Sequence, residues 1–264
     1  MYIIKVLVHG ALGKMGQEIS QAVSSDPELD LVSAVDIRAH TANLVLPNNV
    51  SVLLYDNLDT AINDSKPDVM VDFSTADATM SAVRSAVNND VRLVIGTTGL
   101  SNADNEEIAR LCMAQNLGAV IAANFSLAAA VMISCAKIAS QHFDYAEIIE
   151  LHHEKKLDAP SGTAISTAKA MTVSRGKDFT YALSPNEEIA GSRGGVLGGI
   201  AMHSVRLPGQ LAHQEIIFGS PGQTLRIRLD QISREAFMPS IVMAVKKTME
   251  LKEAIFGLDR LLGL

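Results

Sequence analysis

The chain has 264 residues, a formal net charge of −7, 48% hydrophobic residues and 19% charged residues. This composition is typical of a soluble globular protein with either two domains or one large one. The negative net charge gives no electrostatic support to nucleic-acid binding.

The cysteines and the apolar stretches bear on whether the protein has disulfides, a metal site or a membrane span. Cys112 and Cys135 lack the spacing of a metal site, so we expect buried reduced thiols, no disulfide and no metal. No charged residue lies between Arg110 and Lys137, but polar residues interrupt this stretch. We therefore expect a buried strand over 119–122 and then a buried helix, rather than a membrane span. The N-terminal strand runs directly into a glycine loop and leaves no room for a signal peptide, which predicts a cytoplasmic protein.

The first predicted element is a buried strand that leads into a glycine-rich turn. The apolar run 3–8 precedes Gly10-Ala-Leu-Gly13-Lys-Met-Gly16 and an amphipathic stretch to Val23. Glycines in such a turn let the backbone approach a pyrophosphate at the helix N-terminus. The spacing departs from the usual Gly-x-Gly-x-x-Gly and alone could be only a tight turn. However, Asp36 ends the next apolar run, 29–35, at roughly the position where an acid meets an adenosine ribose. Together these features predict a dinucleotide site that includes Gly10, Ala11, Leu12, Gly13, Lys14, Met15 and Asp36.

Strand-like and helical patterns then alternate. Strands are predicted over 50–54, 69–73 and 93–95, with helices over 76–87 and 102–115. This alternation predicts an α/β fold with a doubly wound parallel sheet, whose ligands bind at the carboxyl ends of the strands.

Two loops follow such strand ends. Phe73-Ser-Thr and Gly96-Thr-Thr-Gly contain small residues that can approach a ribose or a nicotinamide closely. Taken alone, either loop is more often simple turn chemistry.

The second half of the chain contains fewer helical and more strand-like patterns, which fits an α+β domain. Glycine and proline turns separate predicted strands over 145–151, 200–206, 215–218 and 224–229. We expect the glycine-rich segment 191–199 to be mobile near the active cleft or to form a subunit contact. Its Arg193, together with His203 and His213, could be ordinary surface residues.

The chain is predicted to return to helix after Ser233. Ser233 is expected to cap this helix, and an apolar stripe at helical spacing marks one of its faces: Ile241, Ala244, Val245, Thr248 and Leu251.

The segment 150–164 combines proton donors, cations and a helix start. It reads Glu-Leu-His-His-Glu-Lys-Lys-Leu-Asp-Ala-Pro-Ser-Gly-Thr-Ala. A strand should deliver His152 and His153 to its end with their side chains in different directions. Ser161-Gly-Thr-Ala has the pattern of a helix N-terminus, whose N–H groups favour a carboxylate or a phosphate. The histidines could instead be ordinary loop residues and the lysines a solvated run, but the combination favours a site for an anionic substrate.

This segment resembles the signature of the 4-hydroxy-tetrahydrodipicolinate reductase (dihydrodipicolinate reductase) family, E-x-H-H-x-x-K-x-D-A-P-S-G-T-A, and every specified position matches. The resemblance continues through the glycine-rich N-terminus, Val71-Asp-Phe-Ser-Thr, Gly96-Thr-Thr-Gly and Ala123-Asn-Phe-Ser. It covers nearly the whole chain.

The resemblance implies a fold, a domain organisation and an oligomeric state. It implies a Rossmann-like domain of residues 1–123 and 236–264, to which the final helix returns, and a smaller substrate-binding and oligomerisation domain of residues 124–235. It also implies a homotetramer.

The reaction implied is NAD(P)H-dependent reduction of a cyclic dicarboxylate in the diaminopimelate route to lysine. His152 is implied as the general acid, which suits the titration of histidine near neutral pH. Lys156 is implied as a second donor, and the residues implied to bind substrate are His153, Ser161, Gly162 and Thr163. The further residues implied to bind NADH or NADPH are Gly96, Thr97, Thr98, Ala122, Ala123, Asn124 and Phe125.

The choice of cofactor depends on the residues around Asp36. Its carboxylate favours the ribose hydroxyl of NADH and repels the 2′-phosphate of NADPH. Some family members carry an arginine directly after the acid, but here Ile37 follows and Arg38 comes one position later. Exposed charge contacts of this kind are worth less than about tenfold in binding. We therefore expect both cofactors to be used, with NADH at least as good as NADPH.

Two alternatives remain open from the residues alone. One is a dinucleotide-binding sensor that responds to the NAD redox state without turnover, and the other is an enzyme of similar architecture, such as an aspartate- or homoserine-type dehydrogenase. A sensor needs no general acid, and the other dehydrogenases do not require the complete segment 150–164.

Overall fold

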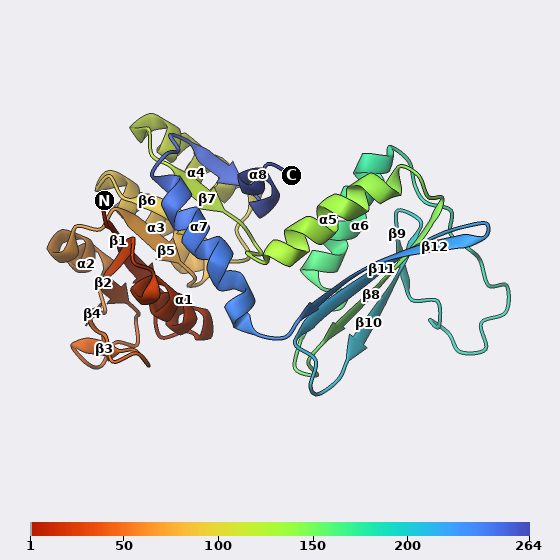
Figure 1. The fold of residues 1–264 in the computed structure, drawn as a ribbon, viewed down its shortest axis with the longest axis horizontal. Helices are drawn as coiled ribbons and strands as arrows, with labels where there is room; N and C mark the ends of the chain where they lie inside the picture. The colour runs from red at the N-terminus through yellow and green to blue at the C-terminus, as the bar shows by residue number, and fades with distance from the viewer. Residues whose placement is uncertain (1) are drawn as a thin grey trace. The chain divides into compact units, whose positions relative to one another are not determined.

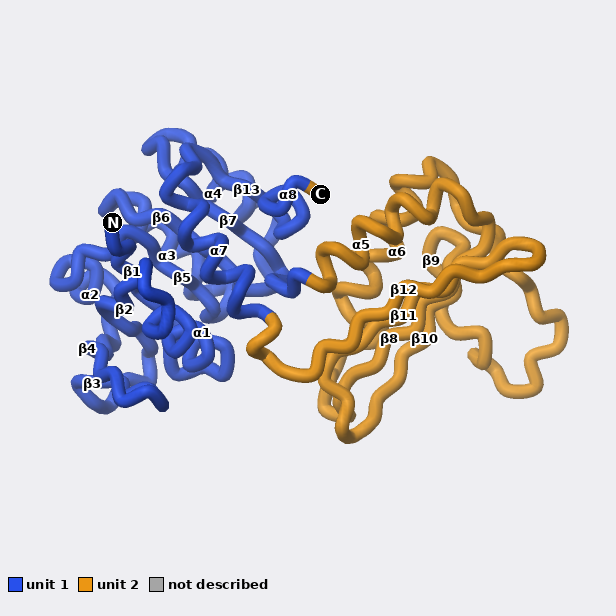
Figure 2. Tube along the Cα trace, viewed as in Figure 1, with its two compact units in different colours: residues 1–127, 237–263 blue, residues 128–236, 264 orange. Residues whose placement is uncertain are grey.

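The computed structural model describes residues 2–264, which form two compact units. Unit 1 is made of two segments, the residues up to Leu127 and Phe237–Gly263. Unit 2 comprises Ala128–Ala236 and Leu264 (Figure 2). The domain boundaries predicted from the sequence lie after residues 123 and 235, whereas the units of the structure divide after residues 127 and 236.

Unit 1 is an α/β layer structure around a mainly parallel sheet (Figure 1). The strand order is β13-β7-β6-β5-β1-β2-β4-β3, and within it β4-β2-β1-β5-β6-β7 is the order of a dinucleotide-binding sheet. The predicted doubly wound sheet is confirmed. Its strands are β1 Ile4–His9, β2 Leu29–Val35, β3 Asn43–Val45, β4 Ser51–Tyr55, β5 Val69–Asp72, β6 Arg92–Ile95, β7 Ala119–Ile121 and β13 Ala254–Phe256.

Helices cover both faces of this sheet. Helix α1 packs against α7, and α7 also contacts β6, while α3 contacts both α2 and α4. The central strands are buried on both sides, which explains their continuous apolar runs. The helices of unit 1 are α1 Lys14–Ser25, α2 Leu58–Ser65, α3 Ala76–Asn88, α4 Asn102–Gln115, α7 Met238–Thr248 and α8 Leu258–Leu262.

Unit 2 is an α+β structure with a mixed sheet of order β12-β11-β8-β10-β9. Strands β8 and β10 are parallel, and the other neighbouring pairs are antiparallel. Side chains of α5 and α6 form one apolar core with alternate residues of β8, β10 and β11. The elements are α5 Leu127–Ser140, β8 Tyr145–His152, α6 Gly162–Arg175, β9 Gly195–Leu197, β10 Ile200–Arg206, β11 Ala212–Ser220 and β12 Gln223–Gln231.

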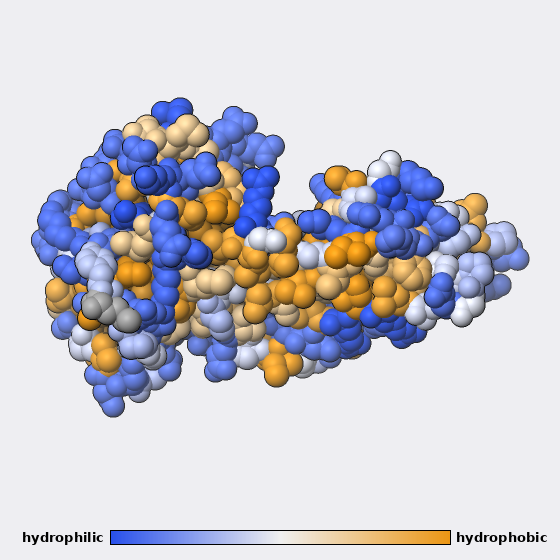
Figure 3. All heavy atoms as spheres, turned by 45° about the horizontal axis from the view of Figure 1, so that its top comes forward, coloured by the Kyte–Doolittle hydropathy of each residue, from blue (hydrophilic) through white to orange (hydrophobic). Residues whose placement is uncertain are grey.

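Helix α5 differs in part from expectation. It is the helix predicted after the strand at 119–122, but Cys135 on it is exposed rather than buried, whereas Cys112 is buried. Both thiols are free. Helix α5 is apolar on its outer side as well, which hid the exposure of Cys135 in the sequence pattern. Figure 3 shows hydrophobic side chains gathered on the surface of unit 2 where α5 runs, and the large exposed ones on this helix are Leu127, Val131 and Ile138.

Several short elements had not been predicted: α2, β3, β9, β13 and α8. The mobility or subunit contact expected of segment 191–199 stays a prediction; within this segment β9 pairs with β10. The predicted start of the last long helix needs correction. Ser233 does not cap the long helix: its Oγ accepts from Glu235 N at the start of a 3₁₀ turn, and α7 begins at Met238. Pro239 explains this start, because proline is tolerated only in the first turn of a helix.

No helix within residues 2–264 is both long and apolar enough to cross a membrane.

Candidate active site

The glycine loop of unit 1 is packed too closely for side chains at two of its positions. A Cβ on Gly16 would lie 2.1 Å from the carbonyl oxygen of Gly10. Gly10 has a positive φ of 82°, and a Cβ there would lie 2.7 Å from the carbonyl oxygen of Phe73. The first turn of α1 follows directly, and its N-cap Gly13 makes no side-chain capping bond. A backbone cradle and the uncapped N–H groups of a helix are the features that a pyrophosphate requires.

Asp36 lies beside this loop and is 5% exposed. Its carboxylate accepts from Leu12 N at 2.9 Å and from Arg38 at the backbone N (3.0 Å), Nε (3.0 Å) and Nη2 (3.1 Å). Burial opposes ionisation of this carboxyl, but the bonds from Arg38 and Leu12 outweigh it and lower the pKa of Asp36. The predicted acid therefore joins the glycine loop to Arg38, while Lys14 is exposed to solvent.

The other loops predicted to bind cofactor meet around Phe73. A Cβ on Gly96 would lie 2.0 Å from the Phe73 ring, and the rings of Phe73 and Phe125 are 5.7 Å apart. Together with the Gly10 contact, these place the glycine loop and the loops after β5, β6 and β7 at one edge of the sheet. Thr97 is buried there, whereas Thr98 and Ala123 are exposed.

A buried hub that sequence reasoning missed holds these loops. Asp72, the last residue of β5, is fully buried and accepts from Ser74 Oγ (2.6 Å), Thr79 Oγ1 (2.6 Å) and Thr97 Oγ1 (3.0 Å). It also pairs with His9 Nδ1 at 2.8 Å. Burial opposes ionisation of Asp72, but the bonds from His9, Ser74 and Thr79 lower its pKa. The sequence signals were a polar residue at the end of an apolar strand and its place in the run Val71-Asp-Phe-Ser-Thr, but Asp72 itself had been given no role.

In unit 2 the strand β8 carries the candidate acid. Residues on the same face of a strand alternate, so Glu150 and His152 share the face of β8 that is covered by α5 and α6. Arg206 on β10 is the register partner of His152 and lies on the same face. The predicted divergence of His152 and His153 stays a prediction, because β8 ends at His152 and His153 lies in the loop that follows.

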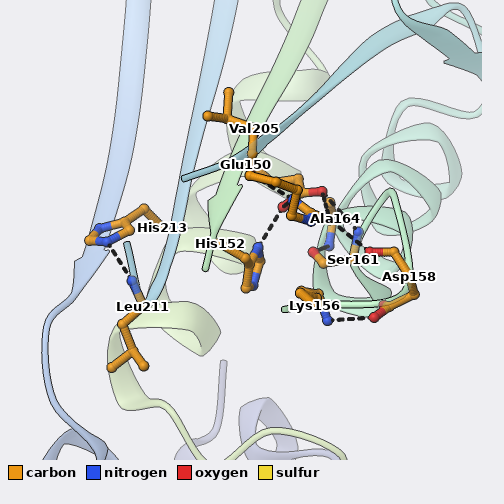
Figure 4. Close-up of polar contacts among 10 residues, drawn as sticks. Glu150, His152, Lys156, Asp158, Ser161, Ala164, Val205, Leu211 and His213 are labelled. Atoms are coloured by element: carbon orange, nitrogen blue, oxygen red, sulfur yellow. Dashed lines mark hydrogen bonds and ion pairs between the residues drawn. The ribbon is translucent and has the colours of Figure 1, made fainter. Parts of the chain in front are cut away.

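Figure 4 shows the contact between Glu150 and His152, and Arg206 joins these two side chains in one hydrogen-bonded group. Glu150 is 1% exposed, and its Oε2 lies 2.5 Å from His152 Nδ1. Arg206 donates to both carboxylate oxygens, from Nη1 at 2.9 Å and from Nη2 at 2.8 Å. Burial opposes ionisation of Glu150, but hydrogen bonds from His152, Arg206 and Ser204 outweigh it and lower its pKa to about 2. Arg206 is a second residue that sequence reasoning missed, because it is distant in the chain and belongs to no recognised motif.

The loop after β8 carries the cations and leads to α6. Lys156 Nζ pairs with Asp158 Oδ1 at 2.8 Å, whereas Lys155 is exposed. Ser161 is the N-cap of α6, since its Oγ accepts from Ala164 N at 3.2 Å, so the predicted helix start is confirmed. A Cβ on Gly162 would meet no atom within 4 Å, which leaves space over the first turn.

Sequence reasoning gave no role to Arg193, His203 and His213. Arg193 and His203 both bind Glu147, which lies on the face of β8 turned away from α5 and α6. His213 pairs with Asp230 of β12 at 2.8 Å. The described residues contain no group of three or more histidine, cysteine or acidic side chains arranged for a metal ion.

The two sites have complementary chemistry. Unit 1 has a dinucleotide-binding sheet and a phosphate cradle. Unit 2 has an imidazole backed by a carboxylate beside a lysine and a helix N-terminus, which suits proton donation to an anion. These features define the class of nicotinamide-dependent oxidoreductases.

Comparison with known proteins identifies the family. The family model described as the N-terminus of dihydrodipicolinate reductase matches residues 4–125, and the model of its C-terminus matches residues 125–262. The chain belongs to this family, whose members are NAD(P)H-dependent 4-hydroxy-tetrahydrodipicolinate reductases of diaminopimelate and lysine biosynthesis.

Individual relatives agree over the whole length. The chain is 48% identical to the 4-hydroxy-tetrahydrodipicolinate reductase of Dehalococcoides mccartyi, over 99% of both chains. It is 38% identical to that of Bacillus subtilis, over 98% of both. A structure of dihydrodipicolinate reductase from Paenisporosarcina sp. TG-14 with dipicolinate bound superimposes with a TM-score of 0.87 at 37% identity, covering 98% of this chain and 99% of that one. An amine dehydrogenase from Mycobacterium smegmatis, with a TM-score of 0.62 at 14% identity, shares the fold alone.

Proposed function

We propose that this protein reduces 4-hydroxy-tetrahydrodipicolinate (dihydrodipicolinate) to tetrahydrodipicolinate with NADH or NADPH. The observation that carries the proposal is the folding of residues 150–164 into one site. In this site His152 is hydrogen-bonded to Glu150, Lys156 lies in the adjacent loop and Ser161 caps α6. A bound reduced nicotinamide supplies the hydride. The dipicolinate-bound relative supports a small dicarboxylate as the substrate.

The residues of unit 2 have separate tasks in this proposal. His152 donates the proton that accompanies reduction, because its imidazole is held at a strand end and is 15% exposed. His153, Ser161, Gly162 and Thr163 bind a carboxylate at the first turn of α6, where the helix dipole favours negative charge.

Lys156 is proposed to bind the dianionic substrate and to act as a second donor. Its ammonium is paired with Asp158, so a substrate carboxylate would compete with that side chain for the same cation. This pairing holds the ammonium in the loop whose Asp158 carbonyl oxygen also accepts from Arg206.

Unit 1 is proposed to hold the cofactor through the glycine loop 10–16, Asp36, Arg38 and the loops that meet around Phe73. Asp36 supports binding of a ribose hydroxyl, and Arg38 supports binding of a 2′-phosphate. Because Arg38 neutralises much of the Asp36 charge, neither cofactor is strongly excluded. We propose that both are used, with NADH at least as good as NADPH.

We also propose a cytoplasmic homotetramer assembled through unit 2. The face of its sheet turned away from α5 and α6 combines apolar residues with ion pairs such as Arg228–Glu215, and β12 is an edge strand. Association is one way to cover such a face and edge. Light scattering at assay concentration should give the mass of a tetramer, and a monomeric mass would reject the assembly.

The activity is tested by oxidation of NADH or NADPH in the presence of the product of dihydrodipicolinate synthase. The matched control omits the synthase. Oxidation that depends on the synthase supports the proposal, whereas cofactor binding without oxidation would favour a sensor. Oxidation of NADH or NADPH with aspartate semialdehyde, or reduction of NAD⁺ or NADP⁺ with homoserine or aspartate, would instead favour a different dehydrogenase.

A further inference from the structure

The environment of Glu150 indicates more than a structural ion pair. Its two oxygens are in hydrogen-bond contact with His152 Nδ1 and accept from both terminal nitrogens of Arg206. They also accept from the backbone N–H of Ser161 at 3.3 Å. Arg206 Nη2 also donates to the carbonyl oxygen of Asp158 at 2.7 Å. One carboxylate and one guanidinium therefore join the imidazole, the lysine loop and the cap of α6.

The charge state of Glu150 determines which imidazole nitrogen carries the proton. A carboxyl group held beside a guanidinium remains ionised at neutral pH and can only accept hydrogen bonds. His152 Nδ1 must therefore be the donor in the 2.5 Å contact. In the neutral ring, Nε2 is then left without a hydrogen and is the nitrogen that can gain and deliver a proton.

We propose that Glu150 and Arg206 are positioning residues for proton transfer, with Arg206 orienting Glu150 and Glu150 holding His152 as the Nδ1–H tautomer so that Nε2 delivers the proton. This inference rests on the proposed role of His152 as the general acid. The carboxylate also stabilises the imidazolium that exists before the proton is delivered. The arrangement resembles other sites in which a buried carboxylate orients a catalytic histidine.

The charged and titratable groups near His152 come from several elements. Glu150 is on the same strand, Arg206 is on β10, and the Lys156–Asp158 pair is on the following loop. The first turn of α6 carries no acidic residue. His213, paired with Asp230, lies on the opposite face, because it is the register partner of Leu151.

Glutamine cannot replace Glu150 without conflict. It has a single acceptor oxygen and two N–H donors, so at least one of its donors would face Arg206 or His152. Glu150→Gln should lower kcat by ~10–10²-fold, less than the full ~10²–10⁴-fold value of a general acid. It should also move the alkaline limb of the pH profile of kcat to lower pH, since the imidazolium loses its carboxylate. The KM for the nicotinamide cofactor should not change.

Glu147 on the same strand provides a matched control. Like Glu150, it binds one arginine and one histidine, Arg193 and His203, but on the other face of β8. Glu147→Gln should leave kcat and the pH profile unchanged. Arg206→Lys keeps the positive charge but loses the two-pronged bond, so its effect should lie between those of wild type and Glu150→Gln.

A measurement on the wild-type protein does not depend on whether the variants fold. Long-range ¹H–¹⁵N NMR of ¹⁵N-histidine-labelled protein reports the tautomer of each imidazole, and His152 is assigned by the signal that His152→Gln removes. The proposal requires a protonated Nδ1 and an unprotonated Nε2 in the neutral ring. An Nε2–H tautomer, or a folded Glu150→Gln variant with wild-type kcat and pH profile, would overturn it. Near wild-type turnover in His152→Gln would instead reject the proposed function of His152.

Discussion

Asp72 in unit 1 and Glu150 in unit 2 are both almost completely buried carboxylates that accept several hydrogen bonds near the end of a strand, and the donors differ. Asp72 is bound by the hydroxyl groups of Ser74 and Thr97 from the loops around the predicted cofactor site, by that of Thr79 from α3, and by His9 at the end of β1. Glu150 in unit 2 is bound by a guanidinium, an imidazole and a backbone N–H. Asp72 therefore organises loops, whereas Glu150 organises charged groups.

The difference shows how the two units divide the chemistry. The site of unit 1 depends on close packing, since Gly16 and Gly96 leave no space for a Cβ and the phosphate cradle consists of backbone. The site of unit 2 depends on the protonation and charge of a few side chains. We therefore expect changes of charge in unit 2 to remove turnover without removing cofactor binding.

His152→Gln is the strongest test of this separation. Loss of one general acid typically lowers turnover by ~10²–10⁴-fold. The dissociation constants of NADH and NADPH should stay within about twofold of wild type, because the glycine loop and the Asp72 hub belong to unit 1. Steady-state kinetics and fluorescence titration with each cofactor provide the two measurements. A purified, folded variant with near wild-type kcat would reject the role of His152.

The low pKa of Glu150 predicts an acid-dependent contribution to stability. The folded pKa, about 2, lies below the ordinary 4.5, so the stabilisation is complete above pH 4.5 and is lost as the pH falls towards 2. At about 1.4 kcal/mol per pKa unit, the maximum contribution is about 3 kcal/mol. Asp72 also titrates below its ordinary value, but that contribution is common to wild type and Glu150→Gln.

Urea denaturation of wild type and Glu150→Gln over this pH range measures the effect. The free energy of unfolding of wild type should fall more steeply between pH 4.5 and pH 2 than that of the variant. Parallel curves of unfolding free energy against pH would mean that the Glu150 carboxyl has the same pKa in the native and unfolded states.

The two adjacent lysines sharpen the comparison within unit 2. Lys156→Ala should lower both kcat and substrate affinity, together by roughly tenfold to a hundredfold, as expected for hydrogen bonds to charged groups. The loss of Lys156 also leaves Asp158 unpaired beside a dianionic substrate. Lys155→Ala is the matched control and should be mild, since Lys155 is exposed. Equal impairment of the two variants in steady-state kinetics would contradict the assignment of Lys156.

The regular elements followed well from the sequence, because their patterns are local. The predicted strands 29–35 and 200–206 and the predicted helix 102–115 have the bounds of β2, β10 and α4. Helix α2 was missed because it is short and only two of its residues are buried.

The candidate site was less predictable, since its organisation depends on contacts between distant segments. Segment 150–164 identified His152, Lys156 and the start of α6, but Arg206 reaches Glu150 only through the pairing of β8 with β10. Asp72 and His9 likewise meet because β1 and β5 are neighbours. Single-sequence patterns contain no information about such pairings.

The smallest predicted effect concerns Arg38 and the preference between NADH and NADPH. Arg38 is 59% exposed, and its guanidinium occupies both oxygens of Asp36. Removing it should free Asp36 to accept from a ribose hydroxyl and remove the cation available to a 2′-phosphate. Arg38→Ala should therefore shift the ratio of kcat/KM values towards NADH, by less than about tenfold because exposed charge contacts are weak.

Arg84 offers a matched control for this change. It is also an exposed arginine with a two-pronged bond to a carboxylate, that of Glu107, but it lies on α3. Arg84→Ala should leave the cofactor ratio unchanged. If Arg38→Ala also leaves it unchanged, Arg38 is only a surface charge that pairs with Asp36. A wild-type preference for NADPH above about a hundredfold would mean that Asp36 does not contact the ribose, because its carboxylate repels a 2′-phosphate.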